Sequence, residues 1–296
     1  MKIGNIRTLT IPYLCFSVLA ILIKTAWNIF FDGAVVEDLV SYFVRFVTGY
    51  GILAIWFLSS YFIARLCFLC IWRFDIKFRC LIVTLIIALS YVVEIIVVKN
   101  TYGIISLKED SLLYYLCIGI SRGLACTFFI EIGYDLAEGL NQIFELKQRF
   151  RLLISIGLMI LDYVLMKLNG SVNFSCLQLG SYPFLIYISA VIGSIGFIIL
   201  IYSLFENHEI KILSYLSKNS LIILCTHMTF MITTLSRVFT DLIFGGITRY
   251  GTYIRDLVAV FLVLCVELPI IYIVNNYMPF MIGKPAKNND NFLNKN

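Results

Sequence analysis

YPFLIYISAVIGSIGFIILIYSLF, residues Tyr182–Phe205, is the stretch that decides the fold class of this chain. It contains no charged residue over the length of about 20 residues that a helix needs to cross the hydrocarbon core of a bilayer. A strand of a membrane barrel would instead alternate polar and apolar residues over about 10 residues. The stretch therefore predicts a transmembrane helix.

Further apolar runs on both sides of this stretch repeat its pattern. Counting outward from it, we expect eight spans: Leu9–Phe31, Ile52–Ile71, Cys80–Val98, Leu112–Tyr134, Leu152–Met166, Tyr182–Phe205, Leu221–Arg237 and Leu257–Val274. The chain of 296 residues is 60% hydrophobic and only 14% charged, whereas a soluble domain carries about 25% charged residues. The predicted fold class is all-α: a polytopic membrane protein with a bundle of about eight transmembrane helices.

The sequence predicts one transmembrane domain over residues 1–282 and a polar, disordered cytoplasmic tail over residues 283–296. Two of the loops between spans, residues 32–50 and 238–256, also carry apolar residues. In the first loop these residues recur at roughly helical spacing. Each loop is therefore expected to hold a short interfacial helix.

Lys and Arg are distributed unequally among the loops. If the N-terminus is cytoplasmic, 13 of them lie in inside segments and 7 in outside loops, which is the bias found in membrane proteins. The end of the seventh span and the loop after it, which carry Arg237, Arg249 and Arg255, run against this bias. The balance predicts that both ends of the chain lie on the cytoplasmic side.

Neither the charge nor the cysteines indicate a nucleic-acid site or a metal site. The net charge of +5 comes from Lys and Arg scattered through short loops, not from one basic face. Most of the nine cysteines lie inside apolar runs. Cys67 and Cys70 form a CxxC pair, but no second ligand pair follows at metal-binding spacing. The cysteines are therefore interpreted as small apolar residues.

Ionisable residues inside predicted spans are costly and usually face a bundle interior or a wet cavity. The spans hold Arg65, Glu94, Arg122, Glu131, Asp162, His227 and Glu267. Arg122 is the most informative because it lies near the centre of its span. Two interpretations of Arg122 stay open: an ion pair between helices, or contact with an anionic group of a substrate.

His227 lies within a predicted helix and is one of two histidines in the chain. A buried neutral imidazole can act as a general base or serve as a hydrogen-bonded structural residue, and both interpretations stay open. Hydroxyl groups able to bond it lie nearby, on Thr226, Thr229, Thr233 and Thr234. Trp56 opens its span at the depth where aromatic residues line the membrane interface.

Several motifs occur in one order along nearly the whole chain. They are a basic turn ending at Arg7 with LTIPY at residues 9–13, the WFL of residues 56–58, the FFIEIGY of residues 128–134, the IGSIG of residues 192–196 and the LSYLSKNSLIILCTH of residues 213–227. Together they resemble the acyltransferase 3 family, membrane O-acetyltransferases of cell-surface glycans.

The resemblance implies an enzyme that moves an acetyl group from acetyl-CoA to a hydroxyl of a surface polysaccharide, a glycan precursor or a lipid-linked saccharide. It implies a multi-pass protein of the bacterial plasma membrane, without a metal and without a nucleic-acid partner. His227 would be the catalytic residue or would line the central cavity. The substrate-binding residues implied are Arg122, Arg65, Ser220, Asn219, Trp56 and Glu131, and the Ser220 hydroxyl would cap the seventh helix.

The sequence departs from the family in two places. Ser217 stands where the family usually has glycine, and the matched motifs begin at the family's third helix. No residue therefore corresponds to the histidine of the family's first helix, and the resemblance implies either an enzyme that works without it or an inactive relative. The alternatives are a transporter or polymerase-like protein of glycan metabolism, which would show broken helices, and a non-catalytic remnant.

Overall fold

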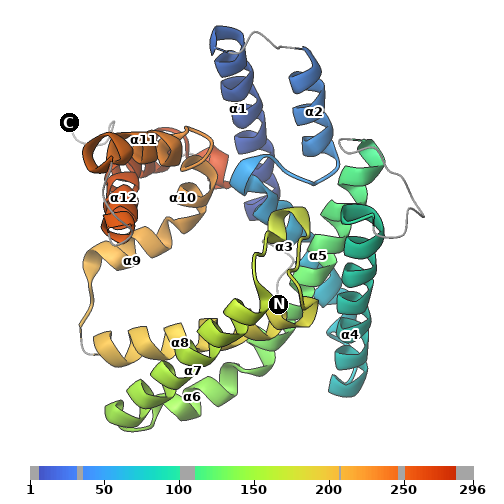
Figure 1. Ribbon diagram of the computed structural model, residues 1–296, viewed down its shortest axis with the longest axis vertical. Coiled ribbons are helices and arrows are strands. Elements are labelled where there is room, and N and C mark those ends of the chain that lie inside the picture. Colours follow the sequence, from blue (N-terminus) through green and yellow to red (C-terminus); the bar gives the residue numbers. More distant parts are fainter. Residues whose placement is uncertain (1–6, 32–35, 101–110, 207, 246–250, 285–296) are drawn as a thin grey trace, which may run out of the picture. The chain divides into compact units, whose positions relative to one another are not determined.

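The computed structural model describes residues 7–31, 36–100, 111–206, 208–245 and 251–284. Over these ranges the regular structure is helical, apart from an isolated bridge between Asn173 and Gln178. Within them, seven helical stretches are long and apolar enough to cross a membrane: α1 (Arg7–Phe31), η2 with α3 (Leu53–Ile55, Trp56–Ile71), α4 with η3 (Ile76–Val93, Glu94–Val98), α5 (Leu112–Asp135), α7 (Gln148–Asn169), α8 (Pro183–Phe205) and α12 (Gly251–Tyr277). The predicted all-α, multi-pass membrane fold is confirmed (Figure 1).

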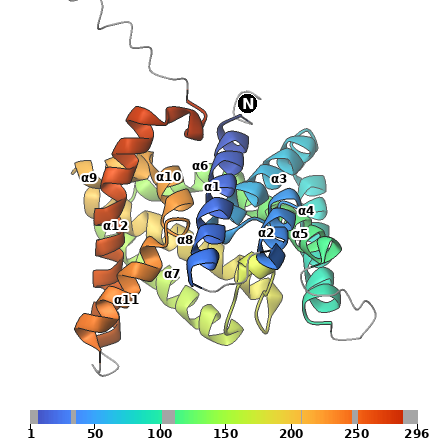
Figure 2. The same ribbon diagram turned by 90° about the horizontal axis from the view of Figure 1, so that it is seen from above.

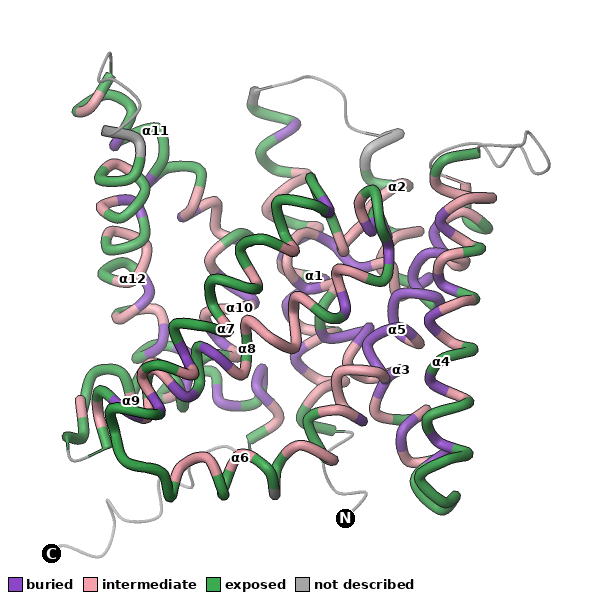
Figure 3. Tube along the Cα trace, turned by 60° about the horizontal axis from the view of Figure 1, so that its bottom comes forward, coloured by how far each residue is buried: buried purple, intermediate pink, exposed green. Residues whose placement is uncertain are grey.

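The long helices carry large apolar side chains on their outer surfaces. Leu153, Ile160 and Leu168 of α7 are exposed, as are Leu257 and Phe261 of α12, and Figure 3 shows how much of both helices is uncovered. Contiguous apolar surface of this kind is rare on soluble proteins, and it is what hydrocarbon requires of a spanning helix.

The predicted seventh span, Leu221–Arg237, is not one helix, and this part of the prediction is wrong. It divides into α10 (Ser220–Thr226) and α11 (Ile232–Phe244), and the backbone unwinds over residues 227–231. Met231 has a positive φ of 56°, which a non-glycine residue rarely adopts. This left-handed residue ends the unwound segment and starts α11.

Shorter helices lie between the spans: α2 (Val36–Val47), α6 (Ala137–Phe144), η4 (Phe174–Cys176) and α9 (Lys211–Lys218). A further one, η5 (Pro279–Ile282), follows α12. α2 confirms the helix expected in residues 32–50. In the range 238–256, where a short helix is expected, residues 238–244 continue α11 and α12 begins at Gly251, while residues 246–250 lie outside the described residues. The predicted tail beyond residue 284 lies outside the described residues.

The chain forms two compact units. Unit 1 comprises Met1–Val47, Gly51–Ser59 and Tyr215–Asn296, and unit 2 comprises Thr48–Tyr50 and Ser60–Ser214. α1, α2, α10, α11 and α12 therefore belong to unit 1, whereas α4 to α8 belong to unit 2.

The core of unit 1 joins α1, η2, α10, α12 and η5. Phe16 and Ala20 of α1 pack in one buried cluster with Ile222, Cys225 and Ile271. α2 is held to α1 by the Tyr13 hydroxyl, which donates to the carbonyl of Phe46 at 2.6 Å. Burial of these side chains fixes α10 against α12 and so positions the break that follows α10.

The core of unit 2 is built on closely packed helix pairs. α7 and α8 lie side by side as an antiparallel hairpin (Figure 1, Figure 2). Ser155 of α7 donates to the carbonyl of Gly196 on α8 at 2.8 Å. A Cβ at Gly193 would lie 2.6 Å from the carboxylate of Asp162. Small residues allow this approach, as is usual between membrane helices.

Candidate functional site

The break between α10 and α11 is the candidate site, because His227 lies there next to Thr226, whose buried hydroxyl contacts the buried Glu267 in unit 1. The carbonyl of His227 accepts from the Thr233 amide at 3.1 Å and from the Thr233 hydroxyl at 3.2 Å. An unpaired carbonyl at membrane depth would cost several kcal/mol. Thr233 therefore stabilises the unwound segment.

The imidazole of His227 is half-buried and held by one ring nitrogen. Nδ1 lies 2.7 Å from the carbonyl oxygen of Ile223, one turn earlier in α10. Because a carbonyl can only accept, Nδ1 must carry the proton of this hydrogen bond. In the neutral ring Nε2 then has a lone pair, and it forms no hydrogen bond with the described residues. His227 can therefore accept a proton from a ligand.

Glu267 of α12 is fully buried beside this histidine's helix. Its Oε2 and the carbonyl of Ile222 each lie 2.7 Å from the hydroxyl of Thr226, which has one proton to donate. A carboxylate would have to share that one proton with the Ile222 carbonyl, whereas a protonated Glu267 donates to Thr226 and makes both contacts full hydrogen bonds. Oε1 of Glu267 has no hydrogen-bond partner among the described residues. The geometry therefore fits a neutral carboxylic acid.

At the other end of α10 the predicted cap is wrong. The N-cap residue is Asn219, not Ser220, and no side chain makes the capping hydrogen bond. Ser220 is exposed, whereas the buried amide of Asn219 donates to the Tyr215 carbonyl at 2.8 Å and accepts from Asn275 at 2.7 Å. Asn219 therefore fixes α10 to α9 and α12.

Arg122 in unit 2 is buried and bonded to the protein itself. Its guanidinium donates to the hydroxyl of Ser60 at 2.8 Å, to the carbonyl of Tyr50 at 2.7 Å, to that of Gly49 at 3.3 Å and to that of Ser175. It also lies 5.3 Å from the centre of the Tyr50 ring. These contacts tie α5 to three other segments of unit 2, which is a structural arrangement.

The other predicted site residues have different surroundings. Glu131 is buried and lies 2.6 Å from Nε of Arg79, which also bonds Asp135 at 2.9 Å. Arg65 is half-buried on α3 and forms no ion pair with the described residues. Trp56 begins α3, and its Cα would lie 2.4 Å from a Cβ at Gly51, so only glycine fits there.

The residues predicted for the site therefore divide between the units. His227, Asn219, Ser220 and Trp56 belong to unit 1, and Arg122, Arg65 and Glu131 belong to unit 2. Sequence reasoning missed Glu267 as the partner of Thr226, although it marked Glu267 as a costly residue within a span.

It also missed a polar cavity of about 240 Å³ beside the break. Two basic residues line this cavity, Lys24 from the first predicted span and Arg237 from the end of the seventh, and nothing in the sequence indicates that they meet. Among the described residues no group of three or more His, Cys, Asp or Glu side chains could hold a metal ion.

Comparisons of the chain with protein-family models, with curated proteins and with solved structures found no match. The geometry at the α10–α11 break and the sequence resemblance together therefore carry the functional argument.

Proposed function

We propose that this chain is a membrane-bound O-acyltransferase of the bacterial plasma membrane. It would move an acetyl group from acetyl-CoA to a hydroxyl of a glycan precursor. The observation that carries the proposal is the free Nε2 lone pair of His227, at the end of the motif that resembles the family. Acyl transfer to a weakly acidic sugar hydroxyl requires such a base.

In the proposed reaction Nε2 of His227 takes the proton of the acceptor hydroxyl, and the oxygen of that hydroxyl attacks the thioester carbonyl of acetyl-CoA. The tetrahedral intermediate then expels the CoA thiolate, and the imidazolium returns its proton to that sulfur. The carbonyl of Ile223 holds Nδ1–H throughout and stabilises the cationic ring, which also lies at the carbonyl end of α10.

The test is transfer of labelled acetyl from acetyl-CoA by membranes that carry the chain. We expect His227→Ala to lower the rate by about 10²- to 10⁴-fold at equal expression, because a general base contributes that much. His208→Ala is the matched control, since His208 is exposed in a loop. An unchanged rate in His227→Ala would remove the histidine from the mechanism, and no transfer by the parent chain would favour the inactive remnant.

A second candidate function is transport, favoured by the break in α10–α11 next to the buried Glu267. Broken helices near buried ionisable groups are typical of transporter binding sites. In that case uptake of a saccharide into vesicles would depend on a proton gradient, and Glu267→Gln would abolish the dependence. Acetyl transfer without any uptake would exclude this function.

A further inference from the structure

The polar cavity of about 240 Å³ brings two basic side chains together within unit 1. Lys24 comes from α1 and Arg237 from α11, and Met228 and Met231 of the unwound segment also line the cavity. Drug-sized ligands occupy cavities of about 300 to 1,000 Å³. This cavity therefore suits a smaller ligand, such as a single polyatomic ion or one charged group of a larger molecule.

The two basic residues carry positive charge that the protein itself does not neutralise. Neither Lys24 nor Arg237 forms an ion pair with the described residues. Cations inside helices that cross a membrane are costly and usually have a partner or face a wet cavity. Two like charges that line the same small cavity also repel each other. A bound anion would offset both costs.

Asp241 is the acidic residue that could neutralise this charge, because it lines the cavity one turn beyond Arg237. Its carboxylate instead bonds the guanidinium of Arg255 at 3.0 Å. Arg255 does not line the cavity, and it also contacts Asp256 at 3.1 Å. Arg255 therefore holds Asp241, and the charges of Lys24 and Arg237 stay available to a ligand.

The first turn of α11 adds hydroxyl groups to the cavity, from Thr233 and Thr234. The Thr233 proton is used on the carbonyl of His227, whereas the Thr234 hydroxyl forms no hydrogen bond with the described residues and can donate to a ligand. Ammonium, guanidinium and hydroxyl groups are all donors. A phosphate group offers several acceptor oxygens and carries up to two negative charges at neutral pH, so it matches these donors in number and charge.

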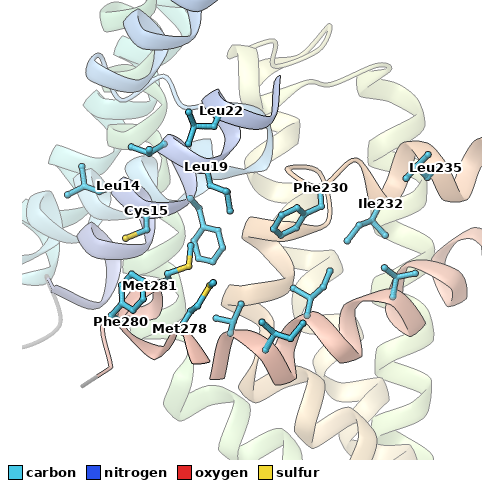
Figure 4. Close-up of a pocket in the computed structure, with 16 residues that line it drawn as sticks. Leu14, Cys15, Leu19, Leu22, Phe230, Ile232, Leu235, Met278, Phe280 and Met281 are labelled. Atoms are coloured by element: carbon cyan, nitrogen blue, oxygen red, sulfur yellow. The ribbon is translucent and has the colours of Figure 1, made fainter. Parts of the chain in front are cut away.

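An apolar groove of about 940 Å³ in the same unit has a different character. Figure 4 shows Leu19 and Leu22 of α1 together with Phe230, Ile232 and Leu235 along it. The described residues that line the groove are all different from those that line the cavity. A ligand of the cavity therefore needs no hydrocarbon chain, and its phosphate can come from solution or from a lipid headgroup.

We infer that the cavity is a binding site for a phosphate group, held between Lys24 of α1 and Arg237 of α11 with a hydrogen bond from Thr234. The site goes beyond the proposed acetyl transfer, because no step of that reaction uses these side chains. A phosphate in this position joins α1 to α11. Its binding should therefore raise the melting temperature of the chain.

The test titrates inorganic phosphate into the full chain in nanodiscs of neutral lipid and follows the heat of binding at constant ionic strength. The double variant Lys24→Gln with Arg237→Gln should lose at least about tenfold in affinity, since charge-assisted hydrogen bonds are removed. Lys211→Gln with Lys218→Gln changes the net charge equally on exposed residues of α9 and should bind normally. Equal binding by the parent chain and the Lys24–Arg237 variant, or no binding by the parent, would overturn the site.

Arg255→Gln tests the same site without changing a residue that lines it. The substitution frees Asp241 to pair with Arg237, and the phosphate affinity should fall by about two- to fivefold, the range of an exposed ion pair. Adding Asp241→Asn to Arg255→Gln should restore the affinity, because the competing carboxylate is gone. Affinity that stays low in this double variant would contradict the role given to the free charge of Arg237.

The source of the phosphate is settled by replacing part of the neutral lipid with phosphatidylglycerol. If the headgroup occupies the cavity, this lipid should weaken binding of inorganic phosphate to the parent chain and should protect the parent, but not the Lys24–Arg237 variant, against thermal unfolding. Unchanged binding would assign the site to dissolved phosphate. Equal protection of both chains by phosphatidylglycerol would show that the lipid acts elsewhere and would exclude the headgroup as the occupant.

Discussion

The contact between Glu267 and Thr226 shows how hydrogen counting assigns a protonation state at the scale of one residue. A carboxylate facing Thr226 would compete with the Ile222 carbonyl for a single hydroxyl proton. It would also leave a charge in a fully buried position, which costs several kcal/mol. A protonated Glu267 satisfies both contacts at once.

Glu267→Gln therefore keeps the hydrogen bond, because the amide of glutamine donates to Thr226 as the acid does. We expect the midpoint of thermal unfolding in detergent to change little in Glu267→Gln. Thr226→Val should lower stability by about 1 kcal/mol through loss of the hydrogen bond. The infrared spectrum of Glu267→Gln should lack one carboxylic-acid carbonyl band that the parent chain shows. Loss of a carboxylate band instead would contradict the neutral assignment, and Glu209→Gln on an exposed loop serves as the control.

A substitution of Arg122 tests whether its role is structural, which its sequence position left open. Arg122→Lys keeps the charge but cannot fork to several carbonyls, and each buried carbonyl left unpaired costs about 1–3 kcal/mol. We expect a loss of about 3 kcal/mol or more in stability, measured by unfolding in detergent. Arg73→Lys, at an exposed turn, should have no effect. A stable Arg122→Lys protein that fails only in acetyl transfer would instead support a substrate contact.

At the scale of elements, one ion pair fixes the end of the α7–α8 hairpin. The buried guanidinium of Arg151 on α7 bonds the carboxylate of Glu206, directly after α8, and also lies 5.0 Å from the Tyr202 ring. The hydrogen bond from Arg151 lowers the pKa of Glu206 below its usual 4.5. The unfolded state therefore binds more protons than the folded state in this range, and stability rises with pH.

We therefore expect the stabilisation from Glu206 to be complete above about pH 4.5 and to disappear as the pH falls through the lowered pKa. Melting temperatures measured in detergent from pH 3 to pH 6 should show this slope. Glu206→Gln should flatten it, while Glu209→Gln should keep it. An identical slope in Glu206→Gln would show that other carboxylates cause the loss of stability at low pH.

The spans that could be predicted are those in which length and hydropathy alone suffice. Tyr182–Phe205 became α8 almost residue for residue, because nothing but a helix satisfies its backbone in hydrocarbon. The break after His227 could not be predicted, since Leu221–Arg237 contains neither Gly nor Pro to mark it. The unwinding depends on Thr233 capping the His227 carbonyl and on a left-handed Met231, and neither has a sequence signature.

The candidate site, too, could be predicted from the sequence only in part. His227 and the cost of Glu267 could be identified from polar residues in apolar runs. The partners of Arg122 could not, because most of them are backbone carbonyls at Gly49, Tyr50 and Ser175, and any residue carries a carbonyl. Lys24 and Arg237 are far apart in the sequence, and only the packing of α1 near α11 places both on one cavity.

At the scale of the whole molecule, the break determines how many times the chain crosses the membrane. α10 has 7 residues and α11 has 13, which correspond to helix lengths of about 10 Å and about 20 Å. Neither alone spans a hydrocarbon core of about 30 Å, but the two together supply that length. Added to the seven long helices found in the described residues, the pair is therefore expected to give eight crossings, and an even number would return the chain to the side where it began.

This parity agrees with the excess of Lys and Arg in the segments assigned to the inside, and it gives a sharp prediction. Reporters that are active only in the cytoplasm should work when fused before Arg7 and after Lys284. After Gly245, only a reporter that is active outside the cytoplasm should work. If α10 and α11 instead fold back without crossing, seven crossings place the two end reporters on opposite sides.

Since unpaired backbone is tolerated in the membrane only when it is capped or lines a cavity, the Thr233 cap on His227 is what lets the broken pair cross. Thr233→Val should therefore lower the outside signal of the Gly245 reporter and leave that of a reporter inserted after Asn169, at the end of the unbroken α7, unchanged.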